Sequence, residues 1–313
     1  MLSHTIKAGD IHDHPDGICA ELPLWNSLET GEGAIAGAVG VSAGTPLVAY
    51  ANTFRLSSNP TARTTIYLDF DGHTTTGTPW NNSTMGPSFY SPAYNTDGNV
   101  SIFSNSELTQ IQQIWQRVAN DFAPFDVNVT TLAPPDDWLI KSSANDPNYG
   151  TRVVITSYGP SSSTAGGIAY IDSFNWNSAT PCFVYNTGVI GVGEAVSHEV
   201  GHTLGLSHDG TLSGSSYYSG HGSGENGWAS IMGVGYYQSV TTWDDGTFYN
   251  SNNNTASANY NRGPDDLGVI TGINGFGYLT DQEGNDQASA NALSIQSGNI
   301  SQNGTIETRS DVD

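Results

Sequence analysis

The segment SHEVGHTLGLSHDG, residues 197–210, constrains the fold strongly, because it holds three of the chain's eight histidines. His198 and His202 are four residues apart, so on an α-helix they lie on one face, about 6 Å apart along the axis. His208 could not face them from a continuing helix. Gly205 can adopt the left-handed conformation that ends a helix sharply. The spacing therefore predicts a helix that stops at this glycine and a chain that turns back.

Three neutral imidazoles with a fourth position left open are typical of a catalytic zinc site. We therefore predict that His198, His202 and His208 bind one zinc ion. Glu199 leans toward the open position, where a carboxylate can take a proton from a water molecule whose pKa the metal has lowered. Surface or capping histidines are one alternative, which five residues at fixed offsets disfavour. A non-catalytic zinc site is another, but it would not need Glu199 and usually takes a fourth protein ligand.

The pattern H-E-x-x-H-x-x-G-x-x-H resembles the signature of the metzincin zinc endopeptidases. Asp209, directly after His208, makes the segment most similar to the adamalysin (reprolysin) branch. The resemblance implies a methionine turn beneath the metal, and Met232 in WASIMGVGYY lies 24 residues after His208. Its implied role is a hydrophobic floor under the histidines, whereas a Met between Ile and Gly is otherwise an ordinary core residue.

One position departs from the astacin-like and serralysin-like metzincins, which carry a tyrosine two residues after this methionine that can reach the zinc. Position 234 is Val here, and tyrosines follow only at Tyr236 and Tyr237. We therefore do not expect a switching tyrosine ligand in this segment. The resemblance instead implies that one of the two tyrosines lines the pocket for the substrate side chain after the cleaved bond.

Apolar periodicity along the chain predicts an α/β (α+β) domain. The expected strands are residues 64–72, 125–131, 151–159, 166–174 and 182–186. The expected helices are residues 106–122 with Ser106 as N-cap, a helix from near Val192 that carries the zinc ligands, and residues 263–270. This order resembles a metzincin over roughly residues 64–275. The resemblance implies a twisted, mostly parallel five-stranded sheet with an active-site helix, and a small lower subdomain after the zinc segment.

In the metzincins, the edge strand beside the zinc pairs with the substrate backbone, which is strand addition to an exposed edge. The resemblance therefore implies that Gly167, Ile168 and Ala169 contact the substrate. An ordinary sheet strand is the alternative.

Composition divides the chain into three predicted segments. Residues 1–60 contain a Gly/Ala-rich stretch and the linker-like SSNPTA, so we interpret them as an N-terminal extension and a candidate pro-segment. Residues 61–280 are the expected catalytic domain. Residues 281–313 resemble the opening of the bacterial pre-peptidase C-terminal domain, a small β-sandwich. They are too few for an independent sandwich, so we expect only its truncated start.

The two cysteines are Cys19, in the N-terminal extension, and Cys182. Metzincin zymogens commonly fill the open coordination position with a pro-segment residue, which is a cysteine in matrix metalloproteinases, adamalysins and pappalysins. A thiolate is a strong zinc ligand, so Cys19 is a candidate zymogen switch. Asp10 is a weaker candidate, by likeness to the astacin aspartate. A Cys19–Cys182 disulfide and a free thiol without a role remain alternatives.

Charge and hydropathy limit the partners and the location. Eight Lys plus Arg against thirty Asp plus Glu give a net charge of -22, which argues against binding nucleic acid or anionic membranes. No stretch approaches about 18 uninterrupted apolar residues, so we expect no membrane-spanning helix. The first residues lack a signal-peptide core, so the protein is either cytosolic or numbered after signal removal. The catalytic prediction favours the second, an extracellular, secreted protein.

The stretch DFDGH, residues 69–73, has acids two apart before a glycine, as calcium loops do, but lacks the later ligands of an EF-hand. Calcium is therefore a candidate second cofactor. Taken together, the patterns predict a secreted zinc-dependent endopeptidase that acts on protein or peptide substrates. The rival hypotheses are a metal-binding module without activity and a non-enzymatic adhesion protein, the latter suggested by the acidic, Gly-rich composition and the tail.

Overall fold

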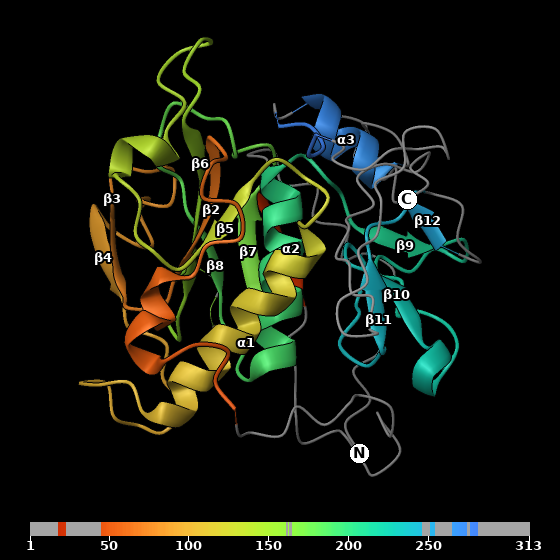
Figure 1. The fold of residues 1–313 in the computed structure, drawn as a ribbon. Coiled ribbons are helices and arrows are strands. Elements are labelled where there is room, and N and C mark those ends of the chain that lie inside the picture. The colour runs from red at the N-terminus through yellow and green to blue at the C-terminus, as the bar shows by residue number, and fades with distance from the viewer. Residues whose placement is uncertain are drawn as a thin grey trace, which may run out of the picture.

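The structure is a computed structural model that describes residues 18–22, 45–160, 162, 165–245, 251–253, 265–273 and 276–280, with the backbone alone for 18–22 and 251–253. A central sheet carries two long helices on one face (Figure 1). A smaller region of short strands follows the histidine-rich segment, residues 197–210. Among the described residues, no helix is both long and apolar enough to cross a bilayer.

The central sheet has the strand order β1-β7-β8-β6-β2-β5. Four of its strands, β2 (Thr64–Asp69), β5 (Asn128–Thr130), β6 (Tyr149–Ile155) and β8 (Cys182–Val184), are parallel, and β7 (Gly167–Tyr170) runs antiparallel to β8. Adjacent residues such as Val153 and Val154 are fully buried in different clusters on the two faces, as expected for parallel strands covered on both sides. The predicted five-stranded, mostly parallel sheet is confirmed.

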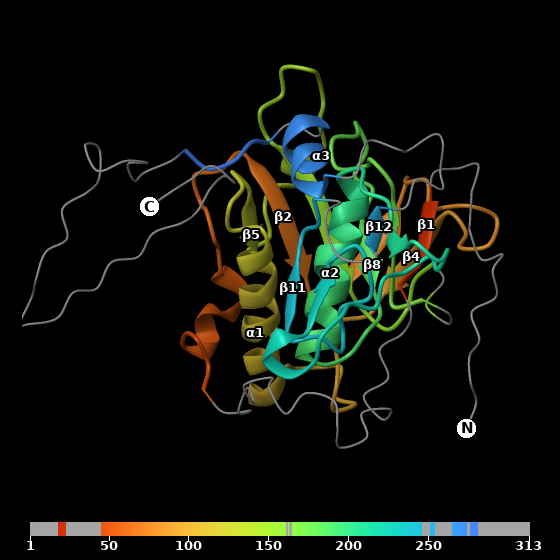
Figure 2. The same cartoon turned by 90° about the vertical axis from the view of Figure 1, so that its right-hand side faces the viewer.

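Helix α1 (Asn105–Asp121) lies on the same face of the sheet as helix α2 (Val189–Thr203), and both helices lie in front of the sheet in Figure 2. Helix α2 packs against β7 and β8. The predicted N-cap of α1 was wrong: Ser104 is the cap, not Ser106. Ser104 Oγ accepts from the Glu107 amide at 3.3 Å, and the Glu107 carboxylate accepts from the Ser104 amide at 2.8 Å. Only Ser104 has a glutamate three residues later, which completes a capping box.

The remaining elements are short. They are η2 (Tyr50–Arg55), β3 (His73–Thr76), β4 (Ser88–Ser91), η3 (Asp136–Leu139), β9 (Asp209–Thr211), η4 (Gly224–Asn226), β10 (Trp228–Ser230), β11 (Val240–Thr242), β12 (Ser251–Asn253) and α3 (Asp266–Ile273). The β3–β4 hairpin was not predicted; Trp80 and Phe89 from this region cover the second face of the sheet. The short strands β9 to β12 form the small region after the zinc segment, as the resemblance implied.

A sixth strand, β1 (Ile18–Leu22), joins the sheet from the N-terminal extension and was not predicted. It pairs antiparallel with β7, and Cys19 lies opposite Ala169. Ile168 lies opposite Phe183 on the other side, so the same register continued by one residue brings Ala169 opposite Cys182.

This register bears on the proposed disulfide. Adjacent strands are about 4.7–4.9 Å apart, so the Cα atoms of Cys19 and Cys182, two strands apart, are separated by roughly 9–10 Å. A disulfide requires less than about 7 Å. The disulfide alternative therefore does not fit this sheet, and Cys182 is a free, buried thiol.

Part of the predicted extension packs against the folded body. The Gln112 side chain on α1 hydrogen-bonds both backbone groups of Val48 and the Thr53 hydroxyl. Ser57 Oγ donates to the side chain of Asn128, the first residue of β5, at 2.8 Å. A removable segment would therefore end before Val48 rather than near residue 60. The predicted sandwich start, residues 281–313, lies outside the described residues.

A polar network links the two long helices α1 and α2. Arg117 on α1 pairs with Glu194 on α2, and Ser197 Oγ donates to Asp121 at 2.6 Å. Burial and then the Glu194 charge raise the pKa of Asp121 to about 7. Thr241 Oγ1 also donates to Glu194 at 3.2 Å, which ties β11 to α2.

Asp121→Asn should change how stability depends on pH. The folded pKa of Asp121, about 7, exceeds the unfolded value of about 3.9, so the native state binds more protons between these values. The free energy of unfolding therefore falls as pH rises from about 4 to 7. Above pH 7, the loss of stability caused by the ionised, buried carboxylate is complete. Asparagine cannot ionise and still accepts from Ser197.

We expect Asp121→Asn to match the parent near pH 4–5 and to exceed its stability at pH 8 by roughly 2–4 kcal/mol in urea unfolding. The exposed Asp137→Asn is the matched control for loss of one charge. Parallel pH profiles for Asp121→Asn and the parent would show that Asp121 does not titrate in this range.

Candidate active site

The active-site helix ends as predicted, at a left-handed glycine. Gly205 has φ of 98°. Its amide donates to His202 O at 2.9 Å, and the Leu206 amide donates to Gly201 O at 3.0 Å. These two bonds form a Schellman motif, which closes the helix and reverses the chain toward His208.

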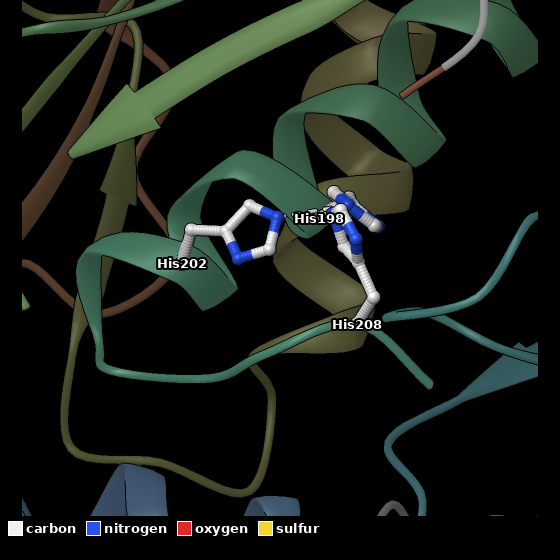
Figure 3. Close-up of side chains that lie close together, drawn as sticks. All are labelled: His198, His202 and His208. Carbon is white, nitrogen blue, oxygen red and sulfur yellow. Dashed lines mark hydrogen bonds between the residues drawn. The ribbon is translucent and has the colours of Figure 1, made fainter. Parts of the chain in front are cut away.

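The turn brings the three histidines together (Figure 3). His198 and His202 extend from α2 and His208 from the segment after the turn, and one nitrogen of each lies within 4.8 Å of the other two. Nε2 of His198 and Nε2 of His202 are 3.0 Å apart. Two nitrogens at about 2.0–2.1 Å from a tetrahedral zinc are about 3.3–3.4 Å apart, so this pair fits the ion after a small outward shift.

Backbone carbonyls orient the two helical histidines. His198 Nδ1 donates to Ile231 O and His202 Nδ1 donates to Leu206 O, each at 2.8 Å. Because a carbonyl can only accept, each Nδ1 carries the proton and each Nε2 lone pair faces the cluster, as is common for metal-binding histidines. Burial lowers the pKa of His202 to about 4, and lowers those of His198 and His208 well below the usual value. All three imidazoles are therefore neutral near pH 7, which is the metal-binding form.

Glu199 follows His198 on α2, and its side chain lies between α2 and β7. Its side chain is 1% exposed, and Oε2 has no hydrogen-bond partner within the described part of the chain. A Cβ atom added to Gly167 would lie 2.5 Å from Glu199 Oε1, so the carboxylate touches the backbone of β7. Burial raises the pKa of Glu199 well above its usual value.

Residues 101–209, roughly a third of the chain, match a family model described as metallo-peptidase family M12B, reprolysin-like. The matched region runs from just before α1 to the residue after His208, so it includes the histidine cluster and Glu199. The protein is a zinc metallopeptidase. No curated protein and no solved structure matches the chain.

Met232 lies beneath the active-site helix of this peptidase. It is fully buried, and a Cβ atom added to Gly201 would lie 2.5 Å from its Sδ. The Met232 carbonyl accepts from the Asp209 amide at 2.9 Å, and the preceding Ile231 carbonyl is the partner of His198. This position suits the floor that the resemblance implied.

The two tyrosines after the methionine differ in exposure. Tyr236 is 2% exposed and its hydroxyl accepts from Asn186 Nδ2 at 2.6 Å, so it is part of the core. Tyr237 is 40% exposed and packs at a right angle against Tyr236. Only Tyr237 offers an open ring surface. The tyrosine in ring contact with the histidines is instead Tyr217, which no sequence pattern singled out.

The remaining predicted site residues lie on β7 and β1, the last two strands at one end of the sheet. Gly167, Ile168 and Ala169 form most of β7, and the backbone of Cys19 runs beside them on β1. The side chain of Cys19 lies outside the described atoms, so its contact with the metal stays a prediction.

The calcium prediction gains no support. Asp69 in DFDGH pairs with the Arg152 guanidinium at 2.5 Å, which already supplies a positive charge. In the part of the chain that the structure describes, the histidine triad is the one group of three or more His, Cys, Asp or Glu side chains arranged to hold a metal.

Proposed function

We propose that this peptidase is an endopeptidase, with His198, His202 and His208 as zinc ligands and Glu199 as the general base. The observation that carries the proposal is the cluster of three neutral imidazoles, together with Glu199 on the same helix, whose buried Oε2 has no hydrogen-bond partner in the described part of the chain. A peptide bound along an edge strand can extend in both directions, which favours cleavage within chains.

Each group has a distinct part in the proposed reaction. Zinc, when bound, acts as a Lewis acid that polarises the scissile carbonyl and makes water more acidic. Glu199 accepts a proton from the attacking water, whose oxygen forms a bond to the carbonyl carbon. Glu199 then returns that proton to the nitrogen of the leaving amine as the C–N bond breaks. The backbone of β7 aligns the peptide, and Gly167 admits it close to the Glu199 carboxylate because it has no side chain.

We also propose that the chain is made as a latent zymogen, and the pairing of β1 with β7 supports this. The N–H and C=O groups on the side of β7 that faces away from β8 can pair with only one strand at a time. With Ile18–Leu22 paired there, a substrate peptide cannot use the same backbone groups. The proposed contact of Cys19 with the metal would add to this block, but the block does not require it.

The experiment for the proposed function combines metal analysis with substrate cleavage. We expect about one zinc per purified chain, as a single three-histidine site implies. After limited proteolysis of the N-terminal segment, an unfolded protein substrate should be cut at internal bonds, which mass spectrometry of the fragments reveals. A chelator should stop cleavage and added zinc should restore it.

The rival functions give other results. Zinc without any cleavage, before and after limited proteolysis, would favour a metal-binding module. Adhesion that persists in chelator would favour a non-enzymatic protein. A folded, metal-free chain prepared without chelators would contradict the zinc site itself.

An extracellular location is part of the same proposal. The acidic composition and the peptidase activity both suit a protein kept away from the cytosol. In cells that make this chain, it should be found in the medium rather than in the cell extract.

A further inference from the structure

Tyr217 lies against the histidine cluster from a segment outside the zinc pattern. Its ring centroid is 4.3 Å from that of His208, with the planes inclined by 36°, and 6.3 Å from that of His198. The ring is half-buried and packs against the core of the protein. Tyr217 therefore borders the cluster on the side of His198 and His208.

The backbone on both sides of this tyrosine is fixed. The chain folds back on itself in a tight turn, in which the Thr211 amide donates a hydrogen bond to the Ser215 carbonyl at 3.0 Å. The Tyr218 amide then donates to Asp209 O at 2.7 Å, and Tyr218 O accepts from the Val234 amide at 2.9 Å. These bonds hold Tyr217 beside the third histidine and tie it to the segment that follows Met232.

The three histidines come from two different backbone segments. His198 and His202 share the rigid backbone of α2. His208 comes from a non-helical segment after the turn, so the helix does not set its position. A neighbouring aromatic ring in contact with an imidazole restricts the rotation of the imidazole.

We propose that Tyr217 is a positioning residue, whose ring holds His208 in its metal-binding orientation. The inference rests on the proposed role of His208 as a zinc ligand. Groups that orient metal-binding histidines typically contribute about 10–100-fold to metal affinity. The contribution of Tyr217 comes from its ring. A phenylalanine at this position should therefore preserve zinc affinity, and an alanine should not.

The test measures zinc affinity of the full chain by competition with a chromogenic chelator. We expect Tyr217→Ala to weaken zinc binding about tenfold or more, and Tyr217→Phe to stay within about threefold of the parent. The visible spectrum of the cobalt-substituted protein should change for Tyr217→Ala and not for Tyr217→Phe. Tyr90→Ala removes a tyrosine that is 58% exposed on β4 and should have no effect.

Each other outcome has a distinct meaning. Parent-like zinc affinity in Tyr217→Ala would overturn the positioning role, as would equal loss in Tyr217→Phe and Tyr217→Ala. His208→Ala separates this inference from the proposed function: if it keeps parent-like zinc binding, the ligand set itself is wrong. If Tyr217→Ala does not fold, as circular dichroism would show, Tyr217→Leu provides the same comparison without the aromatic ring.

Discussion

Glu199→Ala should leave zinc bound and reduce peptide hydrolysis at least about a hundredfold, the usual size of a general-base contribution. The separation of the two effects follows from the geometry. The histidine nitrogens form the metal cluster by themselves, and the Glu199 carboxylate lies against β7 instead. Its Oε2 atom has no partner in the described part of the chain, so the substitution breaks no hydrogen bond at that atom.

The measurement is kcat on a peptide substrate after N-terminal activation, with zinc content determined on the same sample. Glu199→Gln keeps the volume of the side chain and should be equally inactive, which excludes a cavity as the cause. Glu225→Ala removes an exposed acid on η4 and should leave kcat unchanged. Near-normal turnover in either Glu199 variant would remove this residue from the mechanism.

The second large effect should come from removing the chain before residue 45, which we expect to raise peptidase activity at least about tenfold. Strand β1 is tethered to the domain whose edge it covers, so it competes with substrate at an effective concentration on the order of millimolar. A separate peptide substrate at micromolar concentration would rarely displace it. The comparison is kcat/KM of the intact and shortened chains on one peptide, with equal zinc content.

The position of the cut matters for this experiment. A chain that begins at residue 45 keeps the bonds of Gln112 to Val48 and Thr53. A chain that begins at residue 61 loses them, together with the bond between Ser57 and Asn128. We therefore expect the longer of these two forms to be active and stable, and the shorter one to unfold at lower urea.

Two variants of the full chain distinguish thiol inhibition from strand pairing. Cys19→Ser removes the candidate zinc ligand and retains the backbone of β1. Ala20→Pro with Glu21→Pro retains the thiol and disrupts pairing, because successive amides point to opposite sides of a strand and proline has none. Activation by Cys19→Ser alone indicates a thiol switch, and activation by the prolines alone indicates edge competition. An intact chain already as active as the shortened one would refute latency.

The sequence determined the parts of the site that depend on near neighbours. Residues four apart share a helix face, so the spacing of His198 and His202 specified the pair, and Gly205 specified the turn because a left-handed backbone favours glycine. The five main strands were likewise predictable from their apolar patterns. The start of α1 was also encoded locally, because the spacing of Ser104 and Glu107 is that of a capping box, although we predicted Ser106 as the cap.

Tertiary structure decided the contacts between residues that are distant in the sequence. The pairing of Cys19 with Ala169 crosses most of the catalytic domain, and the weakly periodic extension gave no sign of it. The same is true of the Ile231 carbonyl on His198, the Asp121–Ser197 bond between helices and the Tyr217 ring on His208. Periodicity reports which face of an element is buried, but not which partner covers it. Those partners are set by how the layers pack, and our proposals for the third histidine and for latency both depend on them.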